Sequence, residues 1–83
     1  MEYFVYVLQS ESRGSYYVGS TENIQTRLKK HNAGDNLYTK GRRPWKVVYQ
    51  ESFCSRTEAI KREHFFKSGV GRKQLKEILA SQS

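Results

Sequence analysis

The sequence predicts an α+β fold in which a small antiparallel sheet of three strands is flanked by three helices. Three runs of aromatic and β-branched residues are typical of strands. Two segments with capping residues, and a third with helical spacing of its apolar residues, predict the helices. The predicted order is ββαβαα. A chain of 83 residues has room for one domain, which we place at residues 1–83.

The first two predicted strands form a hairpin. Tyr3 to Leu8 is an aromatic and β-branched run, and a turn-rich stretch separates it from the strand Tyr16 to Gly19. If Tyr6 and Tyr17 face each other across the ladder, a four-residue connection, Ser10 to Arg13, joins the strands and both rings lie on one face. Two such tyrosines are either core aromatics or hydroxyls that point to a common site.

The first helix is expected to begin after a cap at Thr21 or Asn23 and to end near Asn32. Ile24 and Leu28 then lie on one face, which we assign to the core.

The rest of the chain predicts a loop, a strand and two helices. Residues 33–44 hold three Gly or Pro residues and predict a loop, and the third strand follows at 46–53. Ser55 to Glu58 is a capping box that opens a helix ending near Ser68. Gly69 to Gly71 then separates this helix from the last one, at 72–80, whose leucine and isoleucine side chains face inward.

Charge and cysteine content limit the function classes. Fifteen Lys and Arg against eight Asp and Glu give a net charge of +7, which favours a polyanionic partner such as nucleic acid. The alternative is a basic protein with no such partner. The single Cys54 suits a reducing compartment, and no His or Cys cluster has zinc spacing. Tyr3 to Leu8 is too short to span a membrane, so we expect a cytoplasmic protein without a membrane partner.

Glu63 is an unusual residue in the second predicted helix. Ala59, Ile60, Phe66 and Lys67 cluster on one side of that helix, and Glu63 falls near the middle of the same arc. Carboxylates are rarely buried without a partner or a metal, because removing the charge from water is costly. Glu63 is therefore either a functional carboxylate or one satisfied by an arginine or by water at the edge of the sheet.

Arg27 and His31 are one turn apart, so they project from one face of the first helix, at the border of the core. Spacing alone also allows a solvated basic face here.

The segment from Tyr38 to Lys46 interleaves aromatic residues with cations, a composition that suits phosphate contacts and base stacking. The alternative is that Tyr38 and Trp45 anchor a surface loop whose cations stay solvated. The candidate nucleic-acid contacts in the whole chain are Lys30, Tyr38, Lys40, Arg42, Arg43, Lys46, Lys67, Arg72 and Lys73.

Five short motifs occur in order along the chain. They are Phe4-Val5-Tyr6, Tyr17-Val18-Gly19, Arg27 to Asn32, Tyr38-Thr39 with Arg43-Pro44, and Ala59 to Glu63. Together they resemble the GIY-YIG endonuclease family, specifically its small stand-alone bacterial members, over residues 3–79. Phe4 replaces the family's first glycine, and no asparagine follows Glu63, although many members have one there.

The resemblance implies hydrolysis of a phosphodiester with one divalent metal ion, Mg²⁺ or Mn²⁺. Glu63 would be the metal ligand, and Arg27 would clamp the charge of the transition state. Tyr17 is the candidate base, although a phenol needs nearby positive charge to lower its ordinary pKa of about 10. Tyr6 would orient the attacking water or a phosphate oxygen. His31 would share the base role or hold the phosphate.

The resemblance also implies a nucleic-acid partner, with DNA favoured over RNA, a role in DNA repair, and a monomer. We expect recognition of structure or backbone rather than of bases, because a chain of this length has no appended targeting domain. Ser20 and Thr21 stand where some members carry a lysine, which leaves transition-state charge to Arg27 and Lys67. The competing hypothesis is a non-catalytic nucleic-acid-binding module on the same scaffold.

Overall fold

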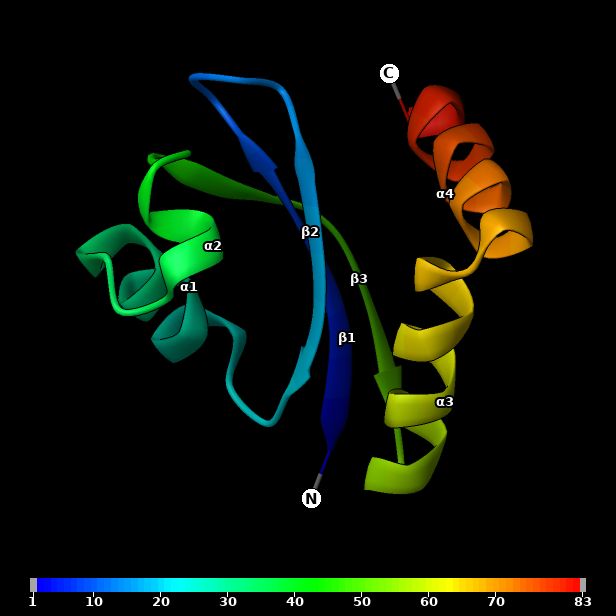
Figure 1. Cartoon of the computed structure of the whole chain (residues 1–83). Helices are drawn as coiled ribbons and strands as arrows, with labels where there is room; N and C mark the ends of the chain where they lie inside the picture. The colour runs from blue at the N-terminus through cyan, green and yellow to red at the C-terminus, as the bar shows by residue number, and fades with distance from the viewer. Residues whose placement is uncertain (1, 83) are drawn as a thin grey trace.

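The computed structural model describes residues 2–82, and its architecture confirms the predicted α+β fold. The strand order is β2-β1-β3, and both pairs are antiparallel. Helices α1 and α2 cover one face of the sheet, and α3 and α4 cover the other (Figure 1). The elements are β1 (Tyr3–Ser10), β2 (Tyr16–Thr21), α1 (Ile24–Ala33), α2 (Leu37–Lys40), β3 (Trp45–Phe53), α3 (Arg56–Lys67) and α4 (Gly69–Gln82).

The hairpin is formed, but its register differs from the prediction by two residues. Tyr6 pairs with Gly19 and Tyr17 pairs with Leu8, so the two tyrosines are diagonal neighbours rather than direct partners. They still lie on one face, with ring centroids 6.3 Å apart. The reason lies in the turn, where Gly14 adopts a left-handed φ of 75° and its N–H bonds back to Ser10.

The predicted loop at 33–44 contains a short helix, α2, which sequence periodicity did not detect. Asn36 caps it, since its side-chain oxygen accepts from the N–H groups of Tyr38 and Thr39. Four residues are too few to produce a helical pattern of apolar positions. Upstream, Asn23 caps α1, and Gly34 ends it in a left-handed conformation.

The predicted break at Gly69 to Gly71 was wrong, because both glycines belong to α4. The break is at Ser68, whose backbone is extended and whose hydroxyl accepts the Gly71 N–H at the start of α4. Gly71 is required for a different reason: a Cβ there would overlap the carbonyl oxygen of Phe65. The glycine therefore lets α3 and α4 meet at a tight corner.

The core has two layers, one on each face of the sheet. On the α3/α4 side, Val5, Val7 and Val18 pack with Phe66 and Leu75.

On the α1/α2 side, Tyr6 and Leu8 pack with Ile24 and Trp45. Since β1 is central and β3 covers one of its edges, β2 has a free edge between the two helical layers.

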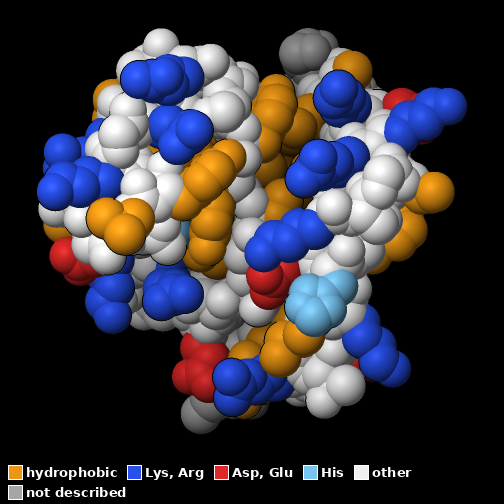
Figure 2. Space-filling view, viewed as in Figure 1, with side chains coloured by type: hydrophobic (Ala, Val, Ile, Leu, Met, Phe, Trp, Pro, Cys, Tyr) orange, Lys and Arg blue, Asp and Glu red, His pale blue; other side chains and the backbone are white. Residues whose placement is uncertain are grey.

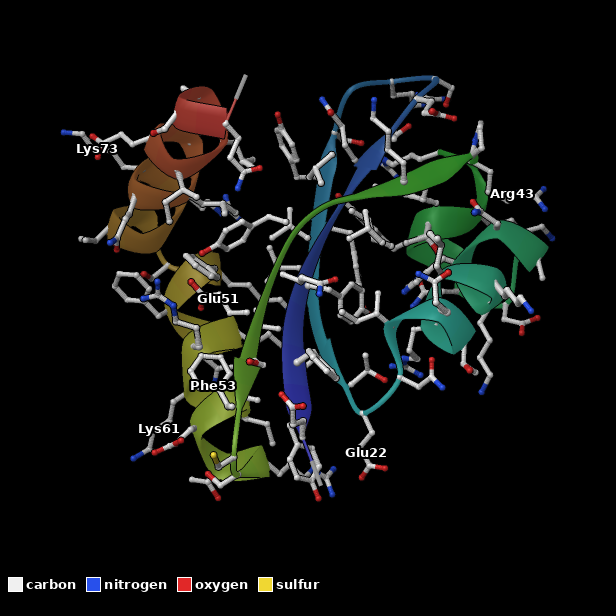
Figure 3. The ribbon with its side chains drawn as sticks, turned by 180° about the vertical axis from the view of Figure 1, so that it is seen from behind. Glu22, Arg43, Glu51, Phe53, Lys61 and Lys73 are labelled. Atoms are coloured by element: carbon white, nitrogen blue, oxygen red, sulfur yellow. The ribbon has the colours of Figure 1, made fainter. Side chains whose placement is uncertain are left out.

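Helix α3 is tied to β3 by a bidentate ion pair. Arg62 Nε lies 2.8 Å from Glu51 Oε1, and its second nitrogen lies 3.1 Å from Oε2 (Figure 3 shows Glu51 on the α3 side of β3). Burial alone would raise the pKa of Glu51, but hydrogen bonds from Arg62 and Tyr49 hold it below its ordinary value. This pair fixes the rotation of α3, and with it the direction in which Glu63 points.

Candidate functional site

The residues predicted to form the site meet around the free edge of β2, and they reach it from both faces of the sheet. Tyr6, Tyr17 and His31 lie in the α1/α2 layer. Glu63 belongs to α3, which packs on the opposite face. Because β2 is an edge strand, groups from both layers can approach each other past it.

Tyr6, predicted to orient the attacking water or a phosphate oxygen, is fully buried in this structure. Its exposed fraction is 0%, and its hydroxyl lies 3.2 Å from His31 Nε2. Burial, and next the nearby Tyr17 hydroxyl, raise the pKa of Tyr6 to about 12. Tyr6 therefore stays protonated at neutral pH, and in this conformation it touches neither bulk water nor a phosphate.

His31 is also buried, with an exposed fraction of 4%, and its Nδ1 lies 3.0 Å from the hydroxyl oxygen of Thr39. Burial, together with the positive charge of Arg27, lowers the pKa of His31, so the imidazole is neutral at pH 7. The expected roles of His31, as a shared base or a phosphate ligand, stay predictions; both require contact with the substrate, and the ring is buried in this structure. Arg27 itself is exposed on α1, and its positive charge opposes the rise in the pKa of Tyr6.

Gly19, the last residue of the second motif, is explained by the position of Tyr6. A Cβ at Gly19 would lie 2.6 Å from the Tyr6 hydroxyl oxygen, which is closer than real Cβ contacts allow. The glycine thus makes room for the buried hydroxyl under β2.

Tyr17 packs among other aromatic rings and remains partly exposed. Its ring is half-buried, 4.7 Å from the His31 ring and 6.1 Å from the Tyr38 ring. Lys67 Nζ lies 5.9 Å from the centre of the Tyr17 ring. Among the described residues, no hydrogen-bond partner is found for the Tyr17 hydroxyl, which leaves it available to a bound molecule.

Glu63 is half-buried and already has two partners. Ser20 donates to Oε1 at 2.7 Å, and Lys67 donates to Oε2 at 2.8 Å. Burial would raise the pKa of Glu63, but these two hydrogen bonds and the charges of Lys67 and His64 hold it below the ordinary value. The carboxylate is therefore ionised at neutral pH, and its charge is satisfied by a lysine rather than by an arginine.

Ser20 contacts the candidate site through Glu63. In the sequence it was noted only because some members of the family carry a lysine near this position. It follows Gly19 on β2, so strand alternation turns its side chain to the α3 face, opposite to Tyr17. That alternation is the signal that could have placed Ser20 beside α3.

Of the candidate site residues, Glu63 is the one whose side chain could bind a hard cation such as Mg²⁺. Within residues 2–82, no group of three or more His, Cys, Asp and Glu side chains could hold a metal ion. Mg²⁺ is often bound by one carboxylate together with water and substrate phosphates, and a carboxylate has about four lone-pair sites, of which two are used here. The residues present therefore fit a singly anchored Mg²⁺ or Mn²⁺.

A groove of about 570 Å³ runs along the free edge of β2. Figure 2 shows hydrophobic side chains along this part of the surface, with Lys and Arg side chains on both sides of it. We call it the β2 groove; its tyrosine and cationic lining residues are Tyr16, Tyr17, Tyr38, Lys67, Arg72 and Lys76. Three of these, Tyr38, Lys67 and Arg72, were predicted as nucleic-acid contacts, and Lys76 was missed.

A second hollow lies at the other end of β2 and contains Arg27, Arg56 and Ser20. Glu63 links the two, because it is bonded to Ser20 of the hollow and to Lys67 of the β2 groove.

Four of the predicted contacts lie elsewhere or have other partners. Arg42 donates to the carbonyl of Tyr38 and stacks on its ring, and Arg43 donates to the carbonyl of Lys40. Both guanidiniums thus stabilise the loop. The other two, Lys46 and Lys73, are not among the residues that line the groove at the β2 edge.

Lys46 sits between two β3 residues that face the α1/α2 layer, so its side chain lies on the opposite face from Tyr17. Lys73 lies on the outer side of α4, far from Arg43 in Figure 3. Lys30 and Lys40 are exposed near the ends of α1 and α2. Of the two anchors considered for the loop, Trp45 is buried and donates to the Thr39 carbonyl, whereas Tyr38 is 48% exposed.

No helix among residues 2–82 has the length and apolar character to cross a membrane.

This chain is similar to known proteins in sequence and in fold. The model of the GIY-YIG catalytic domain matches residues 2–76. A UPF0213 protein of Staphylococcus haemolyticus is 41% identical over 78 residues, which cover 93% of this chain and 94% of that protein. A UPF0213 protein of Staphylococcus aureus is 42% identical over 77 residues. The solution structure of a UPF0213 protein from Bacillus halodurans has a TM-score of 0.57 at 36% identity and covers 94% of this chain and 85% of its own.

Proposed function

Because this chain belongs to the GIY-YIG family of nuclease domains, we propose that residues 1–83 act as one metal-dependent endonuclease domain on DNA in the cytoplasm. The observation that carries the proposal is the grouping at the β2 edge. Tyr17 has a free hydroxyl there, Lys67 lies beside its ring, and Lys67 also bonds the ionised Glu63. A phosphodiester bound at this edge would meet a base, cations and a carboxylate ligand together.

The roles follow from exposure and charge. Arg27 is exposed and carries two parallel N–H donors, so it would clamp the non-bridging oxygens on which negative charge develops. Tyr17 would accept the proton of the attacking water, and Lys67 lies beside its ring, with Nζ 5.9 Å from the ring centre. Glu63 would hold Mg²⁺ or Mn²⁺, and the metal, when bound, would polarise the phosphate and stabilise the leaving oxygen.

The surface around the site supports binding to the DNA backbone. The net charge is +7, and Lys67, Arg72 and Lys76 line the groove that leads to Tyr17. Cations of this kind contact phosphates and carry no base code, so we propose recognition of nucleic-acid structure or backbone by a monomer, and a role in DNA repair.

One observation favours the competing function, a non-catalytic nucleic-acid-binding module. Both oxygens of Glu63 already have protein partners, Ser20 and Lys67. If these bonds are permanent, the carboxylate is structural and the β2 groove serves binding alone.

Cleavage assays separate the two functions. We would incubate the protein with labelled branched DNA, single-stranded DNA and RNA, each with Mg²⁺, Mn²⁺ or EDTA. A nuclease cuts at least the DNA substrates with metal and none with EDTA. The Tyr17→Phe variant, purified in parallel, controls for contaminating nucleases. Binding to every substrate without cleavage under any condition would support the binding module and refute the nuclease.

A further inference from the structure

Thr39 lies in the loop motif that the proposed chemistry does not use, yet it is one of the most buried residues of the chain. Its exposed fraction is 0%. Its hydroxyl oxygen lies 3.3 Å from the carbonyl of Asn36 and 3.0 Å from His31 Nδ1. On the far side of the imidazole, His31 Nε2 lies 3.2 Å from the Tyr6 hydroxyl. A chain of buried polar groups thus connects α2 to β1.

The positions of the protons in this chain follow from counting donors. A carbonyl can only accept, so the single hydrogen of the Thr39 hydroxyl is donated to Asn36. The Thr39 oxygen must then accept from His31, which places the imidazole hydrogen on Nδ1. A neutral imidazole has only one N–H, so Nε2 is an acceptor, and Tyr6 donates its hydrogen to it.

The opposite tautomer leaves a buried hydrogen without an acceptor. With the hydrogen on Nε2, His31 would donate to the Tyr6 oxygen, and the Tyr6 hydroxyl hydrogen would need another acceptor. Tyr6 is 0% exposed, so water does not reach it, and His31 Nε2 is the acceptor found for it among the described residues. An unsatisfied buried donor is unfavourable.

The proton order determines what Tyr6 presents to Arg27. When Tyr6 donates to His31, the lone pairs of its oxygen are left for a donor on the same face of α1, where Arg27 lies one turn before His31. We propose that Thr39 is a positioning residue which, by fixing the tautomer of His31 and the donor direction of Tyr6, orients Arg27 for the phosphate. This role of Arg27 rests on the proposed nuclease function, whereas the proton order does not.

The first test is NMR of the imidazole nitrogens at neutral pH, with the exposed His64 identified through a His64→Gln variant. We expect the His31 hydrogen on Nδ1 in the wild type and in Thr39→Ser, which keeps the hydroxyl. Thr39→Val has the same shape without the acceptor, so either tautomer then leaves one buried donor unpaired. The preference for Nδ1 should therefore weaken, and the His31 and Arg27 Nε–H resonances should shift. Thr57→Val, an exposed threonine of α3, is the matched control and should change neither signal.

The second readout is kinetic. In Thr39→Val, kcat should fall roughly tenfold while KM for DNA changes little, and Thr39→Ser should restore kcat. If Thr39→Val does not fold, Tyr6→Phe replaces it: the hydrogen stays on Nδ1 if Thr39 sets the tautomer. A wild-type hydrogen on Nε2, a move to Nε2 in Tyr6→Phe, or a Thr39→Val protein with unchanged signals and kcat would each overturn the proposal. A wild type that cleaves nothing refutes the nuclease function alone, because the NMR experiment still decides the proton order.

Discussion

Salt-dependent binding offers a quantitative test of the β2 groove. Arg72 and Lys76 are one turn apart on α4, and both line the groove. Lys73 is on the same helix but about 160° around it from the buried Leu75, and Lys46 is on β3, at the opposite edge of the sheet from β2. The double variants Arg72→Gln/Lys76→Gln and Lys46→Gln/Lys73→Gln therefore both lower the net charge from +7 to +5 but differ in where the charge is lost.

The magnitude follows from counterion release. Each lost phosphate contact flattens the slope of log K against log salt by about 0.9 for duplex DNA and about 0.7 for single strands. If Arg72 and Lys76 each contact one phosphate, the groove variant loses about 1.4 to 1.8 units of slope. Over a fourfold change in salt, this difference alters affinity by roughly tenfold. The control pair should leave the slope almost unchanged.

Fluorescence anisotropy with a labelled oligonucleotide in EDTA measures these slopes without cleavage. Equal flattening in both variants would mean that only net charge matters, and it would refute the β2 groove as the path of the backbone. Arg42 and Arg43 are less suitable probes, because their guanidiniums also hold carbonyls of the loop.

Two further substitutions test the site and its support. Tyr17→Phe keeps the packing on His31, so the free energy of unfolding should change by less than about 0.5 kcal/mol, whereas turnover should fall by about 10²-fold or more; equal losses of stability and activity would indicate a core aromatic. The pKa of Glu51 is lower in the folded protein than in the unfolded chain. The ionised Glu51 therefore stabilises the fold fully at pH values above its ordinary pKa, and this stabilisation is lost as the pH falls through the lowered pKa. Denaturant melts from pH 7 to pH 3 should show this loss of stability in the wild type. Glu51→Gln should be less stable at pH 7 by about 1–3 kcal/mol, because Arg62 loses its partner, and its stability should fall less steeply with pH. An unchanged acid profile in the variant would contradict the assigned role of the ion pair.

The sequence was sufficient to place the elements whose ends are marked by side chains. Asn23 and Ser55 cap α1 and α3 as their residue types predicted. The hairpin register was not predictable in the same way, because it depends on the left-handed conformation of Gly14, which strand periodicity does not encode. The one-turn helix α2 was missed because four residues give no periodic signal.

The sequence could suggest which candidate residues lie near one another, but not how deeply each of them is buried. The assumed pairing across the hairpin placed Tyr6 and Tyr17 on one face, but it could not show that Tyr6 is buried beneath Gly19 while Tyr17 is partly exposed. The helical arc identified Glu63 as unusual, but its partner Ser20 is 43 positions away in the sequence. Contacts of that kind are set by how α3 packs on the sheet.

Glu63→Gln tests the central claim most directly, with Glu58→Gln, an exposed acid on the same helix, as the matched control. The substitution removes the charge and keeps the shape. Its stability cost should stay below about 1 kcal/mol, because Lys67 is 46% exposed and can turn to water.

The measurement is the single-turnover rate of DNA cleavage in Mg²⁺, taken with a chemical melt and with DNA binding in EDTA. The nuclease account predicts that Glu63→Gln loses cleavage by roughly 10³-fold or more, keeps its stability, and binds DNA as well as or more tightly than the wild type, since a negative charge near the phosphate is gone. The Glu58→Gln control should cleave normally. Metal-dependent cleavage retained in Glu63→Gln, together with a loss of a few kcal/mol in stability, would contradict the account and make Glu63 a structural ion-pair partner.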